Sequence, residues 1–308
     1  MKSFMSLTRV LTVVLCAIAL FAVSCKKEGS ATDSAAAKEE FAIAASESDA
    51  EAEVIFDDVF DNVVGVDTEV GIGGTGVFGS ANFNSGGFGE ESVNGANGTD
   101  TTRCFTVTYT QLSPPARFPL KVVIDFGAGC TGRDGRVRKG KIIIVYTGRL
   151  FIPGNSTTTT FDGYYVNDVK VEGTHKISNM STSNIIAFRV EVLQGKLSKP
   201  NGNYTQWNSD KTVGQIEGVL TPFNPFDDIF AVSGAANGSV KKGDRLFQWA
   251  TLIKEPLLKK FTCRWISKGV ISMQKNTSPV AELDYGSGTC DNKATLTVNG
   301  QSREITLH

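Results

Sequence analysis

Two stretches of the chain match each other, and each begins and ends with a cysteine. The first runs from Cys104 to Cys130 and closes with F-P-L-K-V-V-I-D-F-G-A-G-C; the second runs from Cys263 to Cys290 and closes with S-P-V-A-E-L-D-Y-G-S-G-T-C. The cysteine separations are 26 and 27 residues, and both copies share a Pro, an apolar run, Asp before an aromatic residue, and two Gly. The match indicates a fold that contains the same local unit twice.

The first residues have the plan of a secretory signal. Lys2 and Arg9 precede an apolar run over 10–23, which is too short and wrongly flanked for a spanning helix. The sequence A-V-S-C that ends at Cys25 resembles the lipobox of bacterial lipoproteins. That resemblance implies a signal peptide over 1–24 and acylation of Cys25, whose lipid chains hold the mature protein on a membrane.

The residues after Cys25 indicate where in the cell envelope the protein is located. No Asp follows the cysteine, and in the enterobacterial sorting pattern this implies the outer membrane. The start C-K-K-E also partly resembles the export signal of surface lipoproteins in the Bacteroidota. We therefore expect a lipid-anchored outer-membrane protein that faces either the periplasm or the cell surface.

Export decides how the remaining cysteines are interpreted. Removal of Cys16 with the signal and acylation of Cys25 leave four cysteines, an even set in an oxidising compartment. Three pairings are possible, and the repeat favours Cys104 with Cys130 and Cys263 with Cys290. A zinc site is the alternative, but no Cys-x-x-Cys spacing and no nearby His supports it.

Charge divides the mature chain into two parts. Residues 26–100 carry a net charge of −13, whereas residues 101–308 carry +10. The stretch 28–50 is rich in Ala, Ser and acids and predicts a disordered spacer, and 71–89 is a Gly-rich linker without the ending of a phosphate loop. We therefore expect an acidic, Gly-rich tether over 25–100 that precedes a domain over 101–308.

One part of this tether predicts a short amphipathic helix near 51–64. Its apolar residues recur at three- and four-residue spacing, with acids between them that predict an acidic outer face. They are Val54, Ile55, Phe56, Val59, Phe60, Val63 and Val64, with Asp57, Asp58 and Asp61. The helix either docks on the basic domain of the same chain, which we favour, or recruits a separate partner.

From residue 104 onward, β-branched and aromatic runs alternate with turn residues. Asn167-Asp168 and Asn299-Gly300 separate strand-like runs and suit tight hairpins. The pattern predicts an all-β fold, an antiparallel β-meander of about ten to fourteen strands, either a sandwich or an open barrel.

Asp125 and Asp284 occupy equivalent places in the two units. A functional hypothesis makes them paired carboxylates for glycoside hydrolysis or ligands for Ca²⁺. The structural hypothesis, which we favour, is that each caps a turn by accepting backbone N–H groups, while Gly supplies positive φ and the aromatic packs beneath.

The only histidines are His175, expected on a sheet surface, and His308. Catalytic groups are therefore sparse, and the chain is interpreted as non-catalytic.

Basic residues cluster after Cys130, where Arg133, Arg136, Arg138 and Lys139 suggest a site for an acidic glycan. The alternative is that these cations compensate the acidic tether of the same chain. The three Trp residues, 207, 249 and 265, either stack on sugar rings or pack in the core, and we favour the core.

The double unit, D-F-G-A-G-C over 125–130 and D-Y-G-S-G-T-C over 284–290, with K-I-I-I-V-Y-T-G and C-R-W-I-S-K-G, resembles a family of Bacteroidota lipoproteins over roughly residues 50–308. The resemblance implies the location in the cell envelope and the two-unit architecture, but it implies no activity. We therefore expect a membrane-anchored protein with a binding or scaffold role, with an acidic glycan or another envelope protein as partner and without cofactor, metal or nucleic acid. The alternatives are a glycan-acting hydrolase and a carrier of lipids or lipoproteins.

Overall fold

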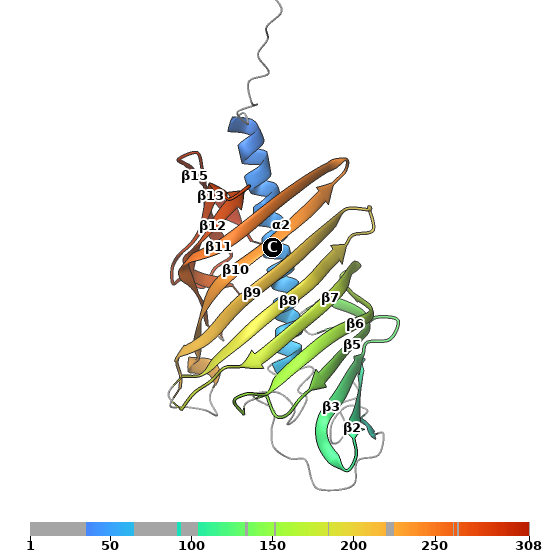
Figure 1. The fold of residues 1–308 in the computed structure, drawn as a ribbon. Helices are drawn as coiled ribbons and strands as arrows, with labels where there is room; N and C mark the ends of the chain where they lie inside the picture. The colour runs from blue at the N-terminus through green and yellow to red at the C-terminus, as the bar shows by residue number, and fades with distance from the viewer. Residues whose placement is uncertain are drawn as a thin grey trace, which may run out of the picture. The chain divides into compact units, whose positions relative to one another are not determined.

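The β domain is one antiparallel sheet in which each strand pairs with its neighbours in sequence (Figure 1). Fourteen strands follow one another in the order β1-β2-β3-β5 and then β6 to β15, and the short β4 pairs beside β5. The prediction of an all-β antiparallel meander is confirmed. Of the two architectures expected, the open form is the correct one, because a single path of strands leaves β1 and β15 as separate edges.

The strand bounds are as follows: β1 Glu91–Val93, β2 Thr106–Ser113, β3 Ala116–Asp125, β4 Cys130–Thr131, β5 Val137–Tyr146, β6 Ser156–Val166, β7 Val169–Asn179, β8 Ala187–Ser198, β9 Tyr204–Glu217, β10 Ile229–Lys242, β11 Arg245–Lys260, β12 Ile266–Lys275, β13 Ser278–Ser287, β14 Lys293–Val298 and β15 Gln301–Thr306. A short 3-10 helix, η1 Pro225–Asp227, precedes β10.

The computed structural model describes residues 35–64, 91–93, 104–132, 135–150, 152–183, 185–219, 225–260, 262–263 and 265–307. The predicted signal peptide over 1–24, Cys25 and the Gly-rich stretch 71–89 lie outside these ranges, so the expectations for them stay predictions. In the described part of the chain, no helix has both the length and the apolar content that crossing a membrane requires.

The tight turns follow from residues that accept positive φ. Asn167 and Asp168 have φ of 47° and 66° between β6 and β7, and Asn299 and Gly300 have 53° and 77° between β14 and β15. Both predicted hairpins are confirmed by this geometry, because two successive positive φ values match the twist of the flanking strands.

Helix α2 spans Ala35–Val64 and has 30 residues, which makes it far longer than the helix expected near 51–64. The expectation of a disordered spacer over 28–50 is wrong for residues 35–50. Their Ala and Glu content favours a helix, and Phe41, Ala42 and Ala45 are buried. The Ala side chains of this stretch carry too little apolar area to identify a buried helix face from the sequence, but docking on a sheet gives them a partner.

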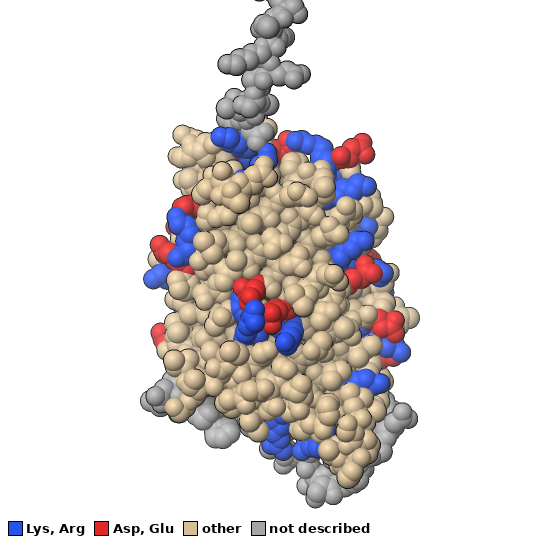
Figure 2. Space-filling model, in the orientation of Figure 1, with Lys and Arg blue, Asp and Glu red and all other residues tan. Residues whose placement is uncertain are grey.

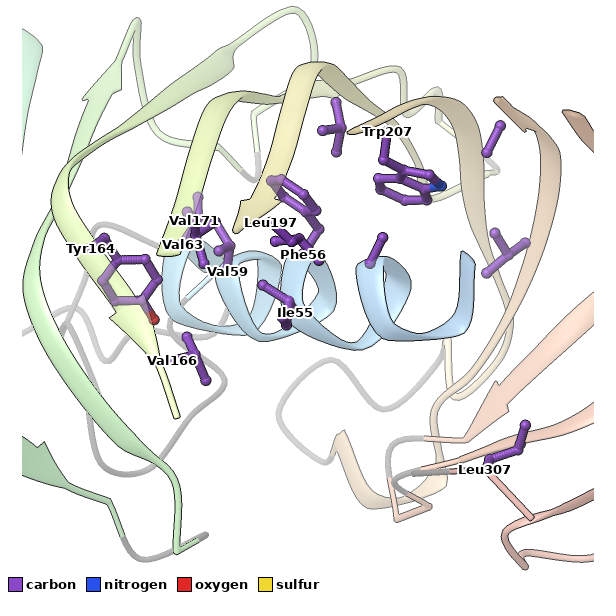
Figure 3. Packing of buried hydrophobic residues seen from close by; sticks show 14 of the residues in the cluster. Ile55, Phe56, Val59, Val63, Tyr164, Val166, Val171, Leu197, Trp207 and Leu307 are labelled. Carbon is purple, nitrogen blue, oxygen red and sulfur yellow. The ribbon is translucent and has the colours of Figure 1, made fainter. Parts of the chain in front are cut away.

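From Glu39 onward, α2 belongs to the same compact unit as the sheet, and the strands curve around it (Figures 1 and 3). Figure 3 shows Ile55, Phe56, Val59 and Val63 of α2 among side chains of the strands. The ring of Phe56 stacks on Trp207, with centroids 5.6 Å apart and planes 21° apart. The helix therefore forms one side of the core, and the inner face of the sheet forms the other.

Trp207 and Trp249 lie in this core, with 2% and 4% of their surface exposed, and Trp265 is partly buried against it. The expectation that the tryptophans pack in the core, and do not stack on sugar rings, is confirmed for Trp207 and Trp249.

Both predicted disulfides are present. Cys104 bonds to Cys130 with Cα atoms 5.3 Å apart, and Cys263 bonds to Cys290 with Cα atoms 5.7 Å apart. Each closes a loop of about 27 residues, which by chain entropy stabilises the folded state by roughly 3 to 4 kcal/mol. The first joins the segment before β2 to β4, and the second joins the β11–β12 connection to the β13–β14 connection.

We expect Phe56→Ala to lower the free energy of unfolding by about 3 to 5 kcal/mol, because it removes a 3%-exposed ring from the helix–sheet contact and leaves a cavity. Urea unfolding monitored by circular dichroism measures this loss. Leu246→Ala, at a side chain that is 55% exposed, is the control and should change the free energy by less than about 0.5 kcal/mol. Equal effects of the two variants would contradict the packing described above.

Candidate functional site

The acids of α2 and the cations of the sheet form one continuous interface, which we call the acidic-helix interface. Seven acids pair with eight cations from strands or hairpins spread across the sheet. The pairs are Glu39 with Arg303, Glu40 with Arg245, Glu47 with Lys242, Glu51 with Lys199, Glu53 with Lys211, Asp57 with Lys259, and Asp58 with Arg136 and Arg138. The hypothesis that the helix docks on the basic domain of its own chain is confirmed by these contacts.

The most buried part of this interface lies at Asp58. Arg138 donates from Nη2 to Oδ1 at 2.5 Å and from Nε to Oδ2 at 3.2 Å, and Arg136 donates to Oδ1 at 2.9 Å. The side chains of Asp58 and Arg138 are only 6% and 3% exposed. The expected acidic outer face is therefore wrong for Asp58, which points into the protein because a planar guanidinium fork satisfies both of its oxygens. The Asp61 side chain lies outside the described residues.

The four basic residues proposed as a glycan site do not form one cluster. Arg136 and Arg138 face the helix, whereas Lys139 pairs with Asp168 at 2.8 Å in an exposed hairpin. Arg133 lies outside the described residues. Since successive strand residues alternate between the two faces of a sheet, the adjacent residues Arg138 and Lys139 point to opposite sides.

A second buried group surrounds Asp49 in the middle of α2. Asp49 accepts hydrogen bonds from the indole Nε1 of Trp207 at 2.8 Å and of Trp249 at 3.4 Å. Lys211 pairs with Glu53 and lies 5.3 Å from the centre of the Trp207 ring. The two indoles therefore keep their polar edge satisfied while their rings remain in the core.

Burial and charge shift the titration of this group. Burial raises the pKa of Glu53 above its ordinary value, and the neighbouring carboxylates of Asp57 and Asp49 add to this against the opposing charge of Lys211. Burial by itself lowers the pKa of Lys211, but the carboxylates of Glu53 and Asp49 raise it above its ordinary value. Each partner thus favours the charged form of the other in a largely buried place, where the Lys211 and Glu53 side chains are 8% and 23% exposed.

His175 lies on the inner face of β7, so the expectation of a sheet-surface residue is wrong. Its ring is fully buried and stacks on Phe56 with centroids 6.2 Å apart. Burial lowers the pKa of His175 to about 4, against a smaller opposing effect of the Asp57 carboxylate. Neither ring nitrogen has a hydrogen-bond partner among the described residues. The imidazole is therefore neutral at physiological pH and packs as a core residue.

Asp125 and Asp284 make the same local contact in the two repeated units. Asp125 Oδ1 accepts from Gly127 N at 2.8 Å, and Asp284 Oδ1 accepts from Gly286 N at 2.8 Å. The two glycines have φ of 59° and 85°, where a side chain would be strained. These contacts support the structural hypothesis, in which the Asp residues shape a turn.

The aromatic residue of each unit also has its expected place. Phe126 is buried in the core, and Tyr285, which is partly buried, packs against the core. The two Asp residues stand on β3 and β13, and β5 to β12 lie between these strands in the sheet. They therefore do not form the close carboxylate pair that glycoside hydrolysis needs.

Sequence reasoning missed the acids of the interface between Glu39 and Glu53. The available signal was the spacing of Phe41, Ala45, Ser48, Ala52 and Phe56, which continues the three- and four-residue periodicity toward the N-terminus. All five are buried. Small and hydroxyl side chains conceal the stripe, because their hydrophobicity does not mark a buried face.

Among the described residues, no group of three His, Cys, Asp or Glu side chains is arranged to hold a metal ion. Comparison with known proteins found no matching family model, no matching curated protein and no matching solved structure.

We expect Asp58→Ala to lower the free energy of unfolding by about 3 to 5 kcal/mol, because it removes the buried carboxylate that accepts two hydrogen bonds from the Arg138 guanidinium. Asp168→Ala, which removes the partner of Lys139 at a site where the Asp side chain is 68% exposed, should cost at most about 1 kcal/mol. Urea unfolding of the two variants side by side measures the difference. A small loss in Asp58→Ala would mean that the ion pair is not buried in solution.

We expect His175 to make the protein less stable as pH falls from 6.5 toward 4. The pKa is about 4 in the folded state and 6.5 in the unfolded chain, so the unfolded state binds the proton first and is favoured. The loss from this group is on the order of 3 kcal/mol across that window. Unfolding free energies measured from pH 7 to pH 4 should fall less steeply in His175→Gln than in the natural sequence. His308→Gln is the control and should keep the natural slope.

Proposed function

We propose that this chain is a lipid-anchored protein of the outer membrane, facing the periplasm or the cell surface, with a non-catalytic binding or scaffold role. The observation that carries the proposal is the docking of α2. The helix begins ten residues after Cys25 and pairs seven of its acids with cations of the sheet. An anchor at Cys25 would therefore be linked to the β domain through α2.

Chain geometry limits how far the β domain can stand from such an anchor. Glu39, where α2 joins the compact unit of the sheet, follows Cys25 by 14 residues, which span at most about 50 Å even when fully extended. A tether over the whole of 25–100 would allow a far greater distance. With α2 docked, the Gly-rich stretch 71–89 connects the helix to the first strands and does not set the distance from the membrane. We therefore propose a membrane-proximal domain.

The residues considered as catalytic or glycan-binding groups make structural contacts, and these contacts support a non-catalytic role. Asp125 and Asp284 bind backbone N–H groups of their own turns, and the buried His175 packs against Phe56. The cations that suggested an acidic glycan, Arg136 and Arg138, already bind Asp58. These contacts favour compensation of the chain's own acids over binding of a polyanion.

The two alternative functions lack a specific observation in their favour. A glycan-acting hydrolase needs two carboxylates that face one cleft, but Asp125 and Asp284 stand on strands separated by β5 to β12. A lipid or lipoprotein carrier needs an apolar cavity, but side chains of α2 pack on the inner face of the sheet (Figure 3). Binding or display by the outer face of the sheet remains the role that the geometry supports best.

We expect Cys25→Ser to move the protein from the membrane fraction to the soluble fraction of the bacterial envelope, because a hydroxyl does not take the lipid that a thiolate takes. Fractionation followed by immunoblotting measures the distribution, and mass spectrometry of the N-terminal peptide measures the acyl mass. Cys16→Ser, inside the apolar run, is the matched control and should leave the protein on the membrane. An unmodified Cys25 in a membrane-bound chain would overturn the proposed anchor.

A further inference from the structure

The outer face of the sheet is poor in charge across β7 to β11. Figure 2 shows this face with most charged side chains toward its margins and one cluster of both signs near its middle. The strand register defines three rows of outward-pointing side chains, which we call the outer patch. The first row is Thr174, Leu193, Asn208, Asn237 and Ala250; the second is Lys176, Glu191, Asp210, Ala235 and Leu252; the third is Ser178, Arg189, Thr212 and Ser233.

The four charged residues of the outer patch form a compact group of balanced charge. Arg189 donates from Nε to Asp210 Oδ1 at 2.9 Å and from Nη2 to Asp210 Oδ2 at 2.6 Å. The same Nη2 lies 3.2 Å from Glu191 Oε1, and Lys176 stands opposite Glu191 in the register. The hydrogen bonds from Arg189 lower the pKa of Asp210, so this carboxylate is ionised at physiological pH. Two cations and two anions leave the group without net charge.

The residues around this group are uncharged, and two of them are large and apolar. Leu193 and Leu252 are 50% and 47% exposed. Asn208 and Asn237 hydrogen-bond to each other across the strands at 3.4 Å. The exposed Leu side chains give the patch apolar area to bury, and the amides and the charged group around them give it polar atoms that can hydrogen-bond across a contact.

We propose that the outer patch binds the outer patch of a second copy of this chain. The balanced charge gives little long-range attraction for a polyanion or a polycation. The three rows contain no aromatic ring on which a sugar could stack. Both signs stand side by side, so the patch is complementary to itself. A two-fold axis that passes between Arg189 and Asp210 sets each guanidinium opposite the carboxylate of the second copy.

The size of the patch fits a weak dimer. Five strands about 4.8 Å apart and three rows about 6.7 Å apart cover roughly 500 Å² per copy. Two copies would bury about 1,000 Å², which is near the lower limit of specific interfaces, so we expect a dissociation constant in the micromolar range. Attachment of both copies to one membrane would raise their effective concentration. This inference deepens the proposed binding role by naming a partner for the outer face.

Charge reversal tests the proposal in the full chain, purified from membranes in excess detergent. Light scattering coupled to size exclusion, at protein concentrations up to about 200 µM, measures the mass of the protein part. The natural sequence should form dimers. Arg189→Glu and Asp210→Arg, each alone, should weaken the dimer about tenfold or more, because each places like charges opposite each other. Lys293→Glu, which reverses an exposed charge on β14, is the matched control and should leave the dimer unchanged.

Mixing the two variants separates this interface from any other. At positions 189 and 210, a chain with Arg189→Glu carries two acids and a chain with Asp210→Arg carries two bases, so an equal mixture should restore dimers. Circular dichroism of each variant confirms that it is folded. A monomeric natural sequence at 200 µM, or a dimer that both single reversals leave intact, would overturn the proposal. The membrane fractionation of Cys25→Ser is measured separately, so failure of the dimer leaves the proposed anchor untouched.

Discussion

The burial of one acidic helix against one face of a basic sheet is the interaction on which this structure depends. A single antiparallel sheet has an inner face that water must not wet, and no second sheet is present in the described chain to cover it. Helix α2 covers it with a stripe of Phe, Ile, Val and Ala side chains. Apolar burial supplies most of the stabilisation, because it removes the largest area from water.

The ion pairs of the interface mainly determine where α2 lies on the sheet. Desolvation offsets much of the Coulomb energy of a buried pair, so pairs such as Asp58 with Arg138 add little net stability. A helix displaced by one turn, however, would leave buried charges without partners, at a cost of several kcal/mol each. The acids of α2 therefore determine where the helix lies on the sheet, while its apolar stripe determines that it docks.

The repeated unit has a comparable structural role at two separate places in the sheet. In each copy an Asp accepts the N–H of the Gly two residues later, and a disulfide closes the loop that the turn belongs to. The first cross-link joins the segment before β2 to β4, and the second joins the β11–β12 connection to the β13–β14 connection. Connections between strands open locally more easily than the strands themselves, so a cross-link between them limits that opening. The unit thus holds the chain together at two separate places in the sheet.

The sequence by itself determined the elements that depend on local chemistry. The alternation of apolar residues predicted the strands, Asn-Asp and Asn-Gly predicted the hairpins, and the repeat predicted both disulfides and the turn-capping role of Asp125 and Asp284. The opposite charges of 26–100 and 101–308 predicted that the two parts attract. Only the tertiary structure decided that residues 35–50 are helical, that Asp58 and His175 are buried, and that Arg138 and Lys139 face opposite sides. The physical reason is that Ala, Ser and charged side chains carry no local sign of burial. The environment of the helix residues is set by partners such as Arg138 and Arg303, which lie 80 and 264 residues away along the chain from Asp58 and Glu39. Those partners meet only when the sheet has formed.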